Sequence, residues 1–130
     1  MTKEKIEQLA TEIKDYLDRR CFNGDVRIYF NGKCWQHGVE DEPVWNDRVK
    51  EFRAPKKGNG WTLIENANPK DYFEYADGII SMSFEGSFYD VMNSRWDYPA
   101  AADAFDSLIQ RYGCWYDLGN TWNICIHNDL

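Results

Sequence analysis

The residues best suited to acid–base and nucleophilic chemistry are few in this chain of 130 residues. It has two histidines, His37 and His127, each in a short alternating stretch typical of a strand, where a histidine usually has a structural role. Ser87 follows a glutamate and a glycine, but a serine nucleophile needs a base beside it, and no histidine is near in sequence. The motifs of serine hydrolases, zinc proteases and nucleotide-binding loops are absent from the sequence. We therefore predict neither a catalytic residue nor a cofactor.

The four cysteines do not form a metal-binding pattern. No two are separated by two residues, and Cys34 and His37 would lie on opposite faces of a strand. The first 20 residues are charged throughout, which is not typical of a secretion signal. We therefore expect no metal site, buried free thiols and a reducing, cytoplasmic compartment. The cysteines are Cys21, Cys34, Cys114 and Cys125.

The net charge of −7 comes almost wholly from the second half of the chain. Residues 71–130 contain two basic side chains, Arg95 and Arg111, against ten acidic ones. Such a chain gains no affinity for nucleic acid through its net charge, so we expect no direct nucleic-acid partner. No apolar run approaches the roughly 20 residues that a membrane span needs, so we expect no membrane partner.

The acidic half suggests a surface that competes for a basic cleft. Carboxylates three or four apart on a helix, or two apart on a strand, lie about 5–7 Å apart, a spacing similar to that of neighbouring phosphates. Trp96, Tyr98 and Trp45 fall outside the clean alternating patterns and are suited to anchor an interface. A solvated surface that only keeps the protein in solution remains the alternative. The candidate partner-binding residues are Glu74, Asp77, Glu85, Asp90, Trp96, Asp97, Asp103 and Asp106.

Three helices are expected to support this surface. Apolar residues recur at helical spacing over Thr2–Arg20, with Thr2 as the cap. A second long helix is predicted over Pro99–Tyr112, ending at Gly113. Its buried residues would be Ala101, Phe105, Leu108 and Tyr112, with Asp103, Asp106, Ser107 and Gln110 facing water. A short helix is predicted over Ser87–Ser94, with Ser87 as its cap.

Three hairpins are expected to form most of the sheet. Their two-residue turns are placed at Asn31–Gly32, Asp77–Gly78 and Gly119–Asn120. The first would pair Phe30 with Lys33 and Ile28 with Trp35, the second Tyr75 with Ile80 and Phe73 with Met82, and the third Trp115 with Ile124 and Cys114 with Cys125. In the second hairpin Glu74 and Glu85 would share a wet face with Ser81 and Ser83.

The segment between the first two hairpins is mixed. Trp45, Val49 and Phe52 are spaced as in a short helix or an irregular segment, and Trp61–Glu65 has the composition of a strand. An acidic loop (Glu40–Pro43) and a basic loop (Ala54–Gly60) flank the first of these. The chain is thus predicted to be a single α+β domain over residues 1–130. It would have an antiparallel sheet of about five to seven strands built from hairpins, with two longer helices packed on one face.

Two segments, Asp71–Asn93 and Arg111–Ile124, resemble short uncharacterised proteins of phages and conjugative elements of gut bacteria. Small acidic proteins of such elements include anti-CRISPR and anti-restriction inhibitors. The resemblance therefore implies a non-enzymatic inhibitor that binds a basic nucleic-acid-targeting nuclease or CRISPR effector of the host. No catalytic motif accompanies it.

Two other functions remain open. The six tryptophans and eight tyrosines would suit a carbohydrate- or small-ligand-binding module if exposed rings were coplanar beside a groove. A small hydrolase would require a cleft that brings His37 or His127 within hydrogen-bond reach of Cys34, Cys125 or a buried carboxylate.

Overall fold

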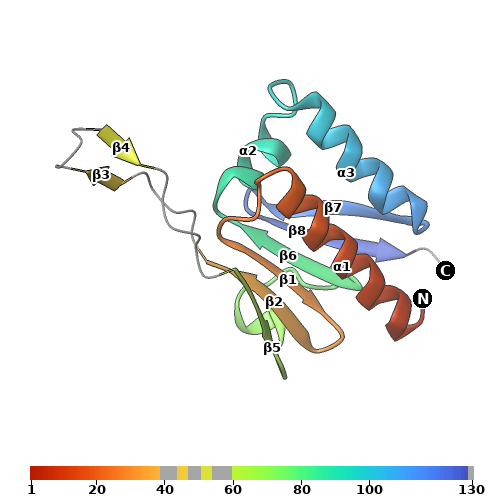
Figure 1. Cartoon of the computed structure of the whole chain (residues 1–130). Helices are drawn as coiled ribbons and strands as arrows, with labels where there is room; N and C mark the ends of the chain where they lie inside the picture. The colour runs from red at the N-terminus through yellow and green to blue at the C-terminus, as the bar shows by residue number, and fades with distance from the viewer. Residues whose placement is uncertain (39–43, 47–50, 54–59, 129–130) are drawn as a thin grey trace.

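A computed structural model describes residues 1–38, 44–46, 51–53 and 60–128. It confirms the α+β prediction: six antiparallel strands form one sheet in the order β5-β2-β1-β6-β8-β7 (Figure 1). Their bounds are β1 Val26–Phe30, β2 Lys33–His37, β5 Trp61–Ile64, β6 Ile80–Phe84, β7 Cys114–Asn120 and β8 Asn123–Asn128. The predicted acidic loop and all of the predicted basic loop except Gly60 lie outside the described residues.

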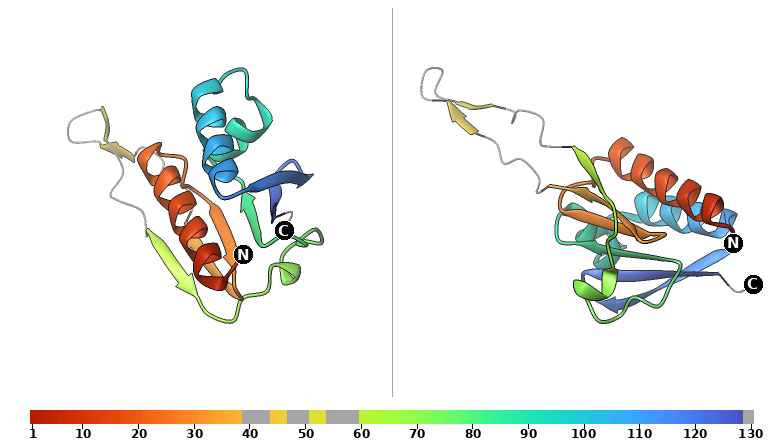
Figure 2. Two further views of the ribbon diagram at one scale, coloured as in Figure 1. Left: turned by 90° about the vertical axis from the view of Figure 1, so that its right-hand side faces the viewer. Right: turned by 90° about the horizontal axis from the view of Figure 1, so that it is seen from below.

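Both long helices, α1 (Lys3–Arg19) and α3 (Pro99–Arg111), cover one face of the sheet (Figure 2). The Thr2 side chain accepts a hydrogen bond from the Lys5 amide at 3.2 Å, which caps α1 as predicted. Gly113 follows α3 with φ of +69°, the left-handed conformation that favours glycine after a helix.

The short helix α2 (Ser87–Asn93) forms where the sequence predicts it, but its cap differs. Gly86 occupies the cap position, and Ser87 is already the first helical residue. The Ser87 hydroxyl donates to the Cys21 carbonyl at 3.4 Å, so it ties α2 to the end of α1. The prediction of Ser87 as the cap is therefore wrong.

The main core lies between the helices and the sheet. Phe84 of β6, Phe88 of α2 and Phe105 of α3 are fully buried and meet edge to face at centroid distances of 5.2 Å. Other fully buried members are Leu9, Ile13, Leu17, Ile28, Ile80, Met82, Ile109, Ile124 and Ile126. This core fixes α2 and α3 relative to each other and to the sheet.

The first hairpin has the predicted register, with Phe30 opposite Lys33 and Ile28 opposite Trp35. Asn31 and Gly32 both adopt positive φ, 48° and 74°, as this two-residue turn requires. Turn chemistry alone was therefore sufficient to align β1 with β2.

The second predicted hairpin does not form. β6 pairs with β1 on one side and β8 on the other, so it is a central strand with no free edge for the preceding segment. Residues 66–79, here called the strap, instead cross the face of the sheet opposite the helices and include the 3-10 helix η1 (Pro69–Asp71) (Figure 2). Phe73 of the strap packs edge-on against Tyr29 of β1 at 5.7 Å.

The strap also changes the environment of the serines on β6. Ser81 and Ser83 are buried, and Glu74 lies on the strap rather than on a strand. The predicted wet face shared by Glu74, Glu85 and the two serines is therefore wrong.

The last hairpin forms, but three residues out of the predicted register. Trp115 lies opposite His127 and Asp117 opposite Cys125, with an irregularity between Leu118 and Asn120. The two residues that turn the chain are Thr121 and Trp122 rather than Gly119 and Asn120. An odd shift exchanges the faces, so the predicted pairing of Cys114 with Cys125 is wrong.

In the segment between β2 and β5, the structure has two short strands, β3 (Val44–Asn46) and β4 (Glu51–Arg53), with Trp45 opposite Phe52. A two-stranded antiparallel sheet therefore forms at Val44–Asn46 and Glu51–Arg53, where the sequence predicted a short helix or an irregular segment. The strand predicted over Trp61–Glu65 is confirmed as β5.

Three of the four cysteines are buried free thiols as predicted, whereas Cys21 is exposed. Among the described residues, no cluster of histidine, cysteine and acidic side chains could hold a metal ion. In the same part of the chain, no helix combines the length and apolar character needed to cross a membrane.

Candidate functional site

Trp96 is the most exposed of the large apolar side chains that the structure describes, with 96% of its surface accessible. It lies in the short turn between α2 and α3, outside the buried stripes of both helices, as its position in the sequence predicted. Two backbone hydrogen bonds, from Asp97 to the Ser94 carbonyl at 2.9 Å and from Tyr98 to the Arg95 carbonyl at 3.2 Å, hold this turn. The indole is therefore presented to solvent by an ordered backbone.

Arg95 ties the same turn to the rest of the fold. Its guanidinium donates to the Asp106 carboxylate of α3 and, at 2.9 Å, to the Tyr116 hydroxyl of β7. Tyr116 in turn donates to the second oxygen of Asp106. Three elements thus meet in one charge-assisted network.

The network changes the electrostatics of its members. The bond to Asp106 raises the pKa of Arg95 above its usual value. Burial, together with the hydrogen bond to the Asp106 carboxylate, raises the pKa of Tyr116 to about 12. Asp106 is half-buried and neutralised by Arg95, so the expectation that it faces water like Asp103 is wrong.

A hollow of about 580 Å³ lies beside Trp96. Met92 and Ala102 are buried at this site, while Asp103 lies exposed on α3. The complete lining is Met92, Asn93, Arg95, Trp96, Pro99, Ala102 and Asp103, with more apolar than polar surface. A hollow of this size accepts one large side chain of a partner.

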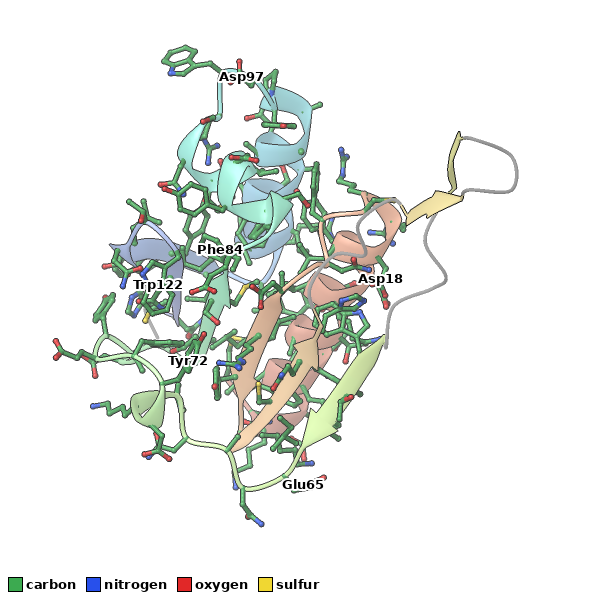
Figure 3. The ribbon with its side chains drawn as sticks, turned by 90° about the vertical axis from the view of Figure 1, so that its left-hand side faces the viewer. Asp18, Glu65, Tyr72, Phe84, Asp97 and Trp122 are labelled. Carbon is green, nitrogen blue, oxygen red and sulfur yellow. The ribbon has the colours of Figure 1, made fainter. Side chains whose placement is uncertain are left out.

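The predicted acidic residues separate into two groups. Asp90, Asp97, Asp103 and Asp106 belong to α2, α3 and the turn between them, and Glu85 lies between β6 and the Gly86 cap of α2. Glu74 and Asp77 belong to the strap on the other face of the sheet. Figure 3 shows Asp97 at one end of the molecule and Tyr72, a strap residue, well away from it. Asp77 also forms an exposed ion pair with Lys70 at 3.2 Å.

We call the first group without Glu85, together with the residues that line the hollow, the Trp96 corner: Asp90, Met92, Asn93, Arg95, Trp96, Asp97, Pro99, Ala102, Asp103 and Asp106. Asp90, Asp97 and Asp103 are exposed, and none of them forms an ion pair with a lysine or arginine of the described residues. The corner therefore joins an apolar hollow, a projecting indole and uncompensated negative charge.

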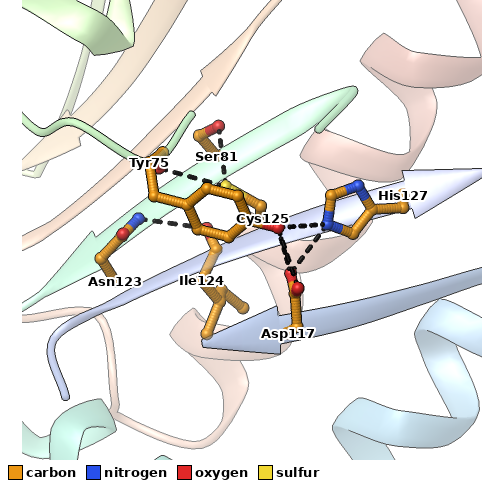
Figure 4. A network of polar contacts seen from close by, with 7 residues as sticks. All are labelled: Tyr75, Ser81, Asp117, Asn123, Ile124, Cys125 and His127. Atoms are coloured by element: carbon orange, nitrogen blue, oxygen red, sulfur yellow. Dashed lines mark hydrogen bonds and ion pairs between the residues drawn. The ribbon is translucent and has the colours of Figure 1, made fainter. Parts of the chain in front are cut away.

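A second polar cluster was not found by sequence reasoning. On the strap side of the sheet, the Nε2 atom of His127 lies 2.7 Å from Asp117 and 3.1 Å from the Tyr75 hydroxyl (Figure 4). Trp115 stacks on the His127 ring at 4.4 Å. The cluster depends on a strap and a register that local patterns did not predict.

The surroundings of the two histidines and of a group of three aromatic rings differ from what a hydrolase or a carbohydrate-binding module would require. His37 forms a hydrogen bond with the Gly38 carbonyl at 3.0 Å and packs edge-on against Trp61. The carboxylate that His127 reaches, Asp117, is 44% exposed rather than buried. Tyr72, Phe73 and Trp122 meet at interplanar angles of 74–78° rather than as parallel rings.

Comparisons with known proteins identify no relative of this chain. No family model matches the chain, and neither the curated proteins nor the solved structures contain a match. The functional argument therefore depends on the geometry of the chain itself.

Proposed function

We propose that this chain works by binding another protein, with the Trp96 corner as its contact surface. The observation that carries this proposal is the exposure of Trp96 on a turn that Arg95 anchors to Asp106 and Tyr116. Tryptophan supplies a large share of the binding energy in many interfaces, and an anchored one loses little conformational entropy when it binds.

The chemistry of the corner favours a basic partner. Asp103 lines the hollow, while Asp90 is exposed on α2 and Asp97 on the turn before α3, and none of the three forms an ion pair within the described residues. Charges of one sign at a rim steer an oppositely charged partner and discriminate against like-charged ones. A partner that offers lysines or arginines around an apolar side chain is therefore complementary to this surface.

We further propose that the partner is a basic nucleic-acid-targeting protein of the host, a nuclease or CRISPR effector, which the chain inhibits in the cytoplasm. The negative corner supports this choice of partner, and the resemblance to proteins of mobile elements supports the inhibitory role. Because Glu74 and Asp77 lie on another face, the contact is assigned to the corner rather than to all the acidic residues of the second half.

The test is a binding assay of the purified chain against a panel of restriction enzymes and CRISPR effectors at low salt, by biolayer interferometry. We expect one partner to bind with an affinity that falls as salt rises, because exposed charges are screened. Trp96→Ala should weaken binding by at least about tenfold, as expected for an interface anchor.

Two controls are matched to the variants. Ile64→Ala removes another exposed apolar side chain, 39% accessible, on β5 at the opposite edge of the sheet from β7. Glu74→Lys reverses a charge on the strap, to be compared with Asp97→Lys on the corner. Equal losses from Glu74→Lys and Asp97→Lys would contradict the assignment of the contact to the corner. Binding to no panel member at micromolar concentration would contradict the proposed class of partner.

A further inference from the structure

A second hollow lies next to the first along α3. It has a volume of about 340 Å³ and is lined by Asp106, Ile109, Gln110, Cys114, Trp115 and Tyr116. Ile109 and Cys114 are buried there, and Trp115 on its rim is 45% exposed. The wall between the two hollows is the Arg95–Asp106 ion pair, since Arg95 lines the first hollow and Asp106 the second.

The two hollows use equivalent positions of α3. The first is lined by Pro99, Ala102 and Asp103, and the second by Asp106, Ile109 and Gln110. Each residue of the second set follows its counterpart by seven positions, which is two turns of a helix and about 10.5 Å along its axis. Both hollows therefore lie on the same side of α3, with Trp96 lining the first and Trp115, whose ring stacks on His127, at the rim of the second.

The distance between the two hollows indicates which backbone conformation of a partner could fill both of them. Residues seven apart on an α-helix lie on one face and about 10.5 Å apart, which matches the hollows. Same-face residues of an extended strand repeat at about 6.6 Å and then about 13 Å, which does not match. A polyproline helix repeats its face at about 9.3 Å, shorter than the spacing by about 1 Å.

Resting on the proposed function of the corner, we propose that the bound element of the partner is a basic amphipathic α-helix lying along α3. Two apolar side chains of that helix, seven residues apart, enter the two hollows. A lysine or arginine beside the first of these side chains faces Asp103, the exposed carboxylate that lines the first hollow and supplies the charge complementarity.

The probe is a stapled peptide of about 15 residues, built from alanine and lysine with two leucines seven positions apart. The matched control has the same composition with its leucines five positions apart, so that they lie on different faces of the helix. Binding is measured by isothermal titration calorimetry and by the shift of the Trp96 indole N–H resonance. We expect the seven-residue spacing to bind at least about tenfold more tightly than the five-residue spacing.

Substitutions on α3 test each hollow separately. Asp103→Trp and Gln110→Trp place an indole at equivalent positions of the first and second hollow, and Ser107→Trp places one at an exposed position that lines neither. We expect Asp103→Trp and Gln110→Trp each to weaken peptide binding at least about tenfold, and Ser107→Trp to leave it within about twofold. Circular dichroism of each variant confirms its helix content.

The outcomes separate this inference from the proposed function. If a protein of the panel binds and loses affinity with Trp96→Ala but not with Gln110→Trp, the corner is the contact surface and the two-hollow helix is wrong. Equal binding of both leucine spacings, or tighter binding of a polyproline peptide, would also overturn the helix. If neither a panel protein nor any peptide binds, both proposals are wrong.

Discussion

The hydroxyl of Tyr75 lies 2.9 and 2.8 Å from the two carboxylate oxygens of Asp117, although 42 residues separate them in the chain. The same hydroxyl lies 3.1 Å from Nε2 of His127, and the backbone carbonyl of Tyr75 accepts from the Cys125 thiol at 3.2 Å. The strap is thus fastened at its middle to both strands of the last hairpin. We infer that these bonds hold the strap on the second face of the sheet.

Replacing Tyr75 with phenylalanine should loosen the strap while leaving the helical layer intact. The change removes the bonds to Asp117 and His127, and the Asp117 carboxylate loses its hydroxyl donor. We expect a lower melting temperature, unchanged helix content in far-ultraviolet circular dichroism, and faster hydrogen exchange at the strap. Tyr98→Phe is the control, because the structure describes a ring contact for Tyr98 with Phe22 but no bond from its hydroxyl. Equal effects of the two variants would show that the Tyr75 hydroxyl does not fasten the strap.

The folded chain should lose stability at alkaline pH. Burial, together with the bond to Asp106, raises the pKa of Tyr116 from 10.0 to about 12, and burial raises that of Tyr16 to about 12. The folded state therefore keeps both protons while the unfolded chain begins to lose them near pH 10. This contribution to stability is fully present below about pH 10 and is lost as the pH rises towards about 12. Urea denaturation at about pH 8.5 and about pH 11.5 measures it.

Tyr116→Phe provides the control for this pH dependence. It removes one of the raised pKa values, so the fall in the free energy of unfolding between the two pH values should be smaller than in the unmodified chain. A fall of the same size would mean that Tyr116 is not responsible for part of the alkaline loss.

Gly78→Ala should be costly, because the added Cβ would collide with the backbone carbonyl of Ile126. That carbonyl also accepts a hydrogen bond from Ile79 at 2.8 Å, so the end of the strap has no room to move without losing it. We expect a destabilisation of about 2 kcal/mol, typical of overpacking. Gly38→Ala meets no atom within 4 Å and should change stability by less than about 0.5 kcal/mol. Chemical denaturation of both variants compares them, and similar values would contradict the tight contact.

Trp96→Ala should leave stability nearly unchanged, within about 0.5 kcal/mol, because the side chain is almost wholly exposed. Urea denaturation measures this independently of any partner. A loss of several kcal/mol would show that the indole packs within the fold, and it would remove the basis for an interface anchor.

Local signals predicted the elements whose boundaries depend on turn and cap chemistry. Thr2 and Pro99 mark the starts of the two long helices, and Asn31–Gly32 sets the register of the first hairpin. In each case a few adjacent residues determine the outcome. The exposure of Trp96 was also predictable, because it interrupts every apolar periodicity around it.

The wrong strand pairings were predicted where segments distant in sequence compete for the same strand edge. Phe73 and Tyr75 alternate as in a strand, but β1 and β8 already occupy both edges of β6, so these side chains cover the sheet instead. In the last hairpin the irregularity after Leu118 moves the turn by two residues, which no local turn preference indicates.

The candidate site was only partly predictable for the same reason. The acidic residues of the corner were identified by composition, but the network of Arg95, Asp106 and Tyr116 joins three elements whose packing is not encoded in any single window. One feature of the sequence did point to this network, because Arg95 is one of only two basic residues after position 70. One of two cations among ten acidic side chains is suited to a specific carboxylate partner.

The position of β6 at the centre of the sheet constrains how the protein is made on the ribosome. One edge of β6 is covered by β1, which is synthesised earlier, but the other is covered only by β8, the last strand of the sheet in chain order. A nascent chain that lacks β8 therefore leaves an apolar strand with an open edge, the kind of surface that associates with other chains. Completion of the sheet must wait for the synthesis of β8, and truncation before Asn123 should yield an aggregating product rather than a shorter folded one.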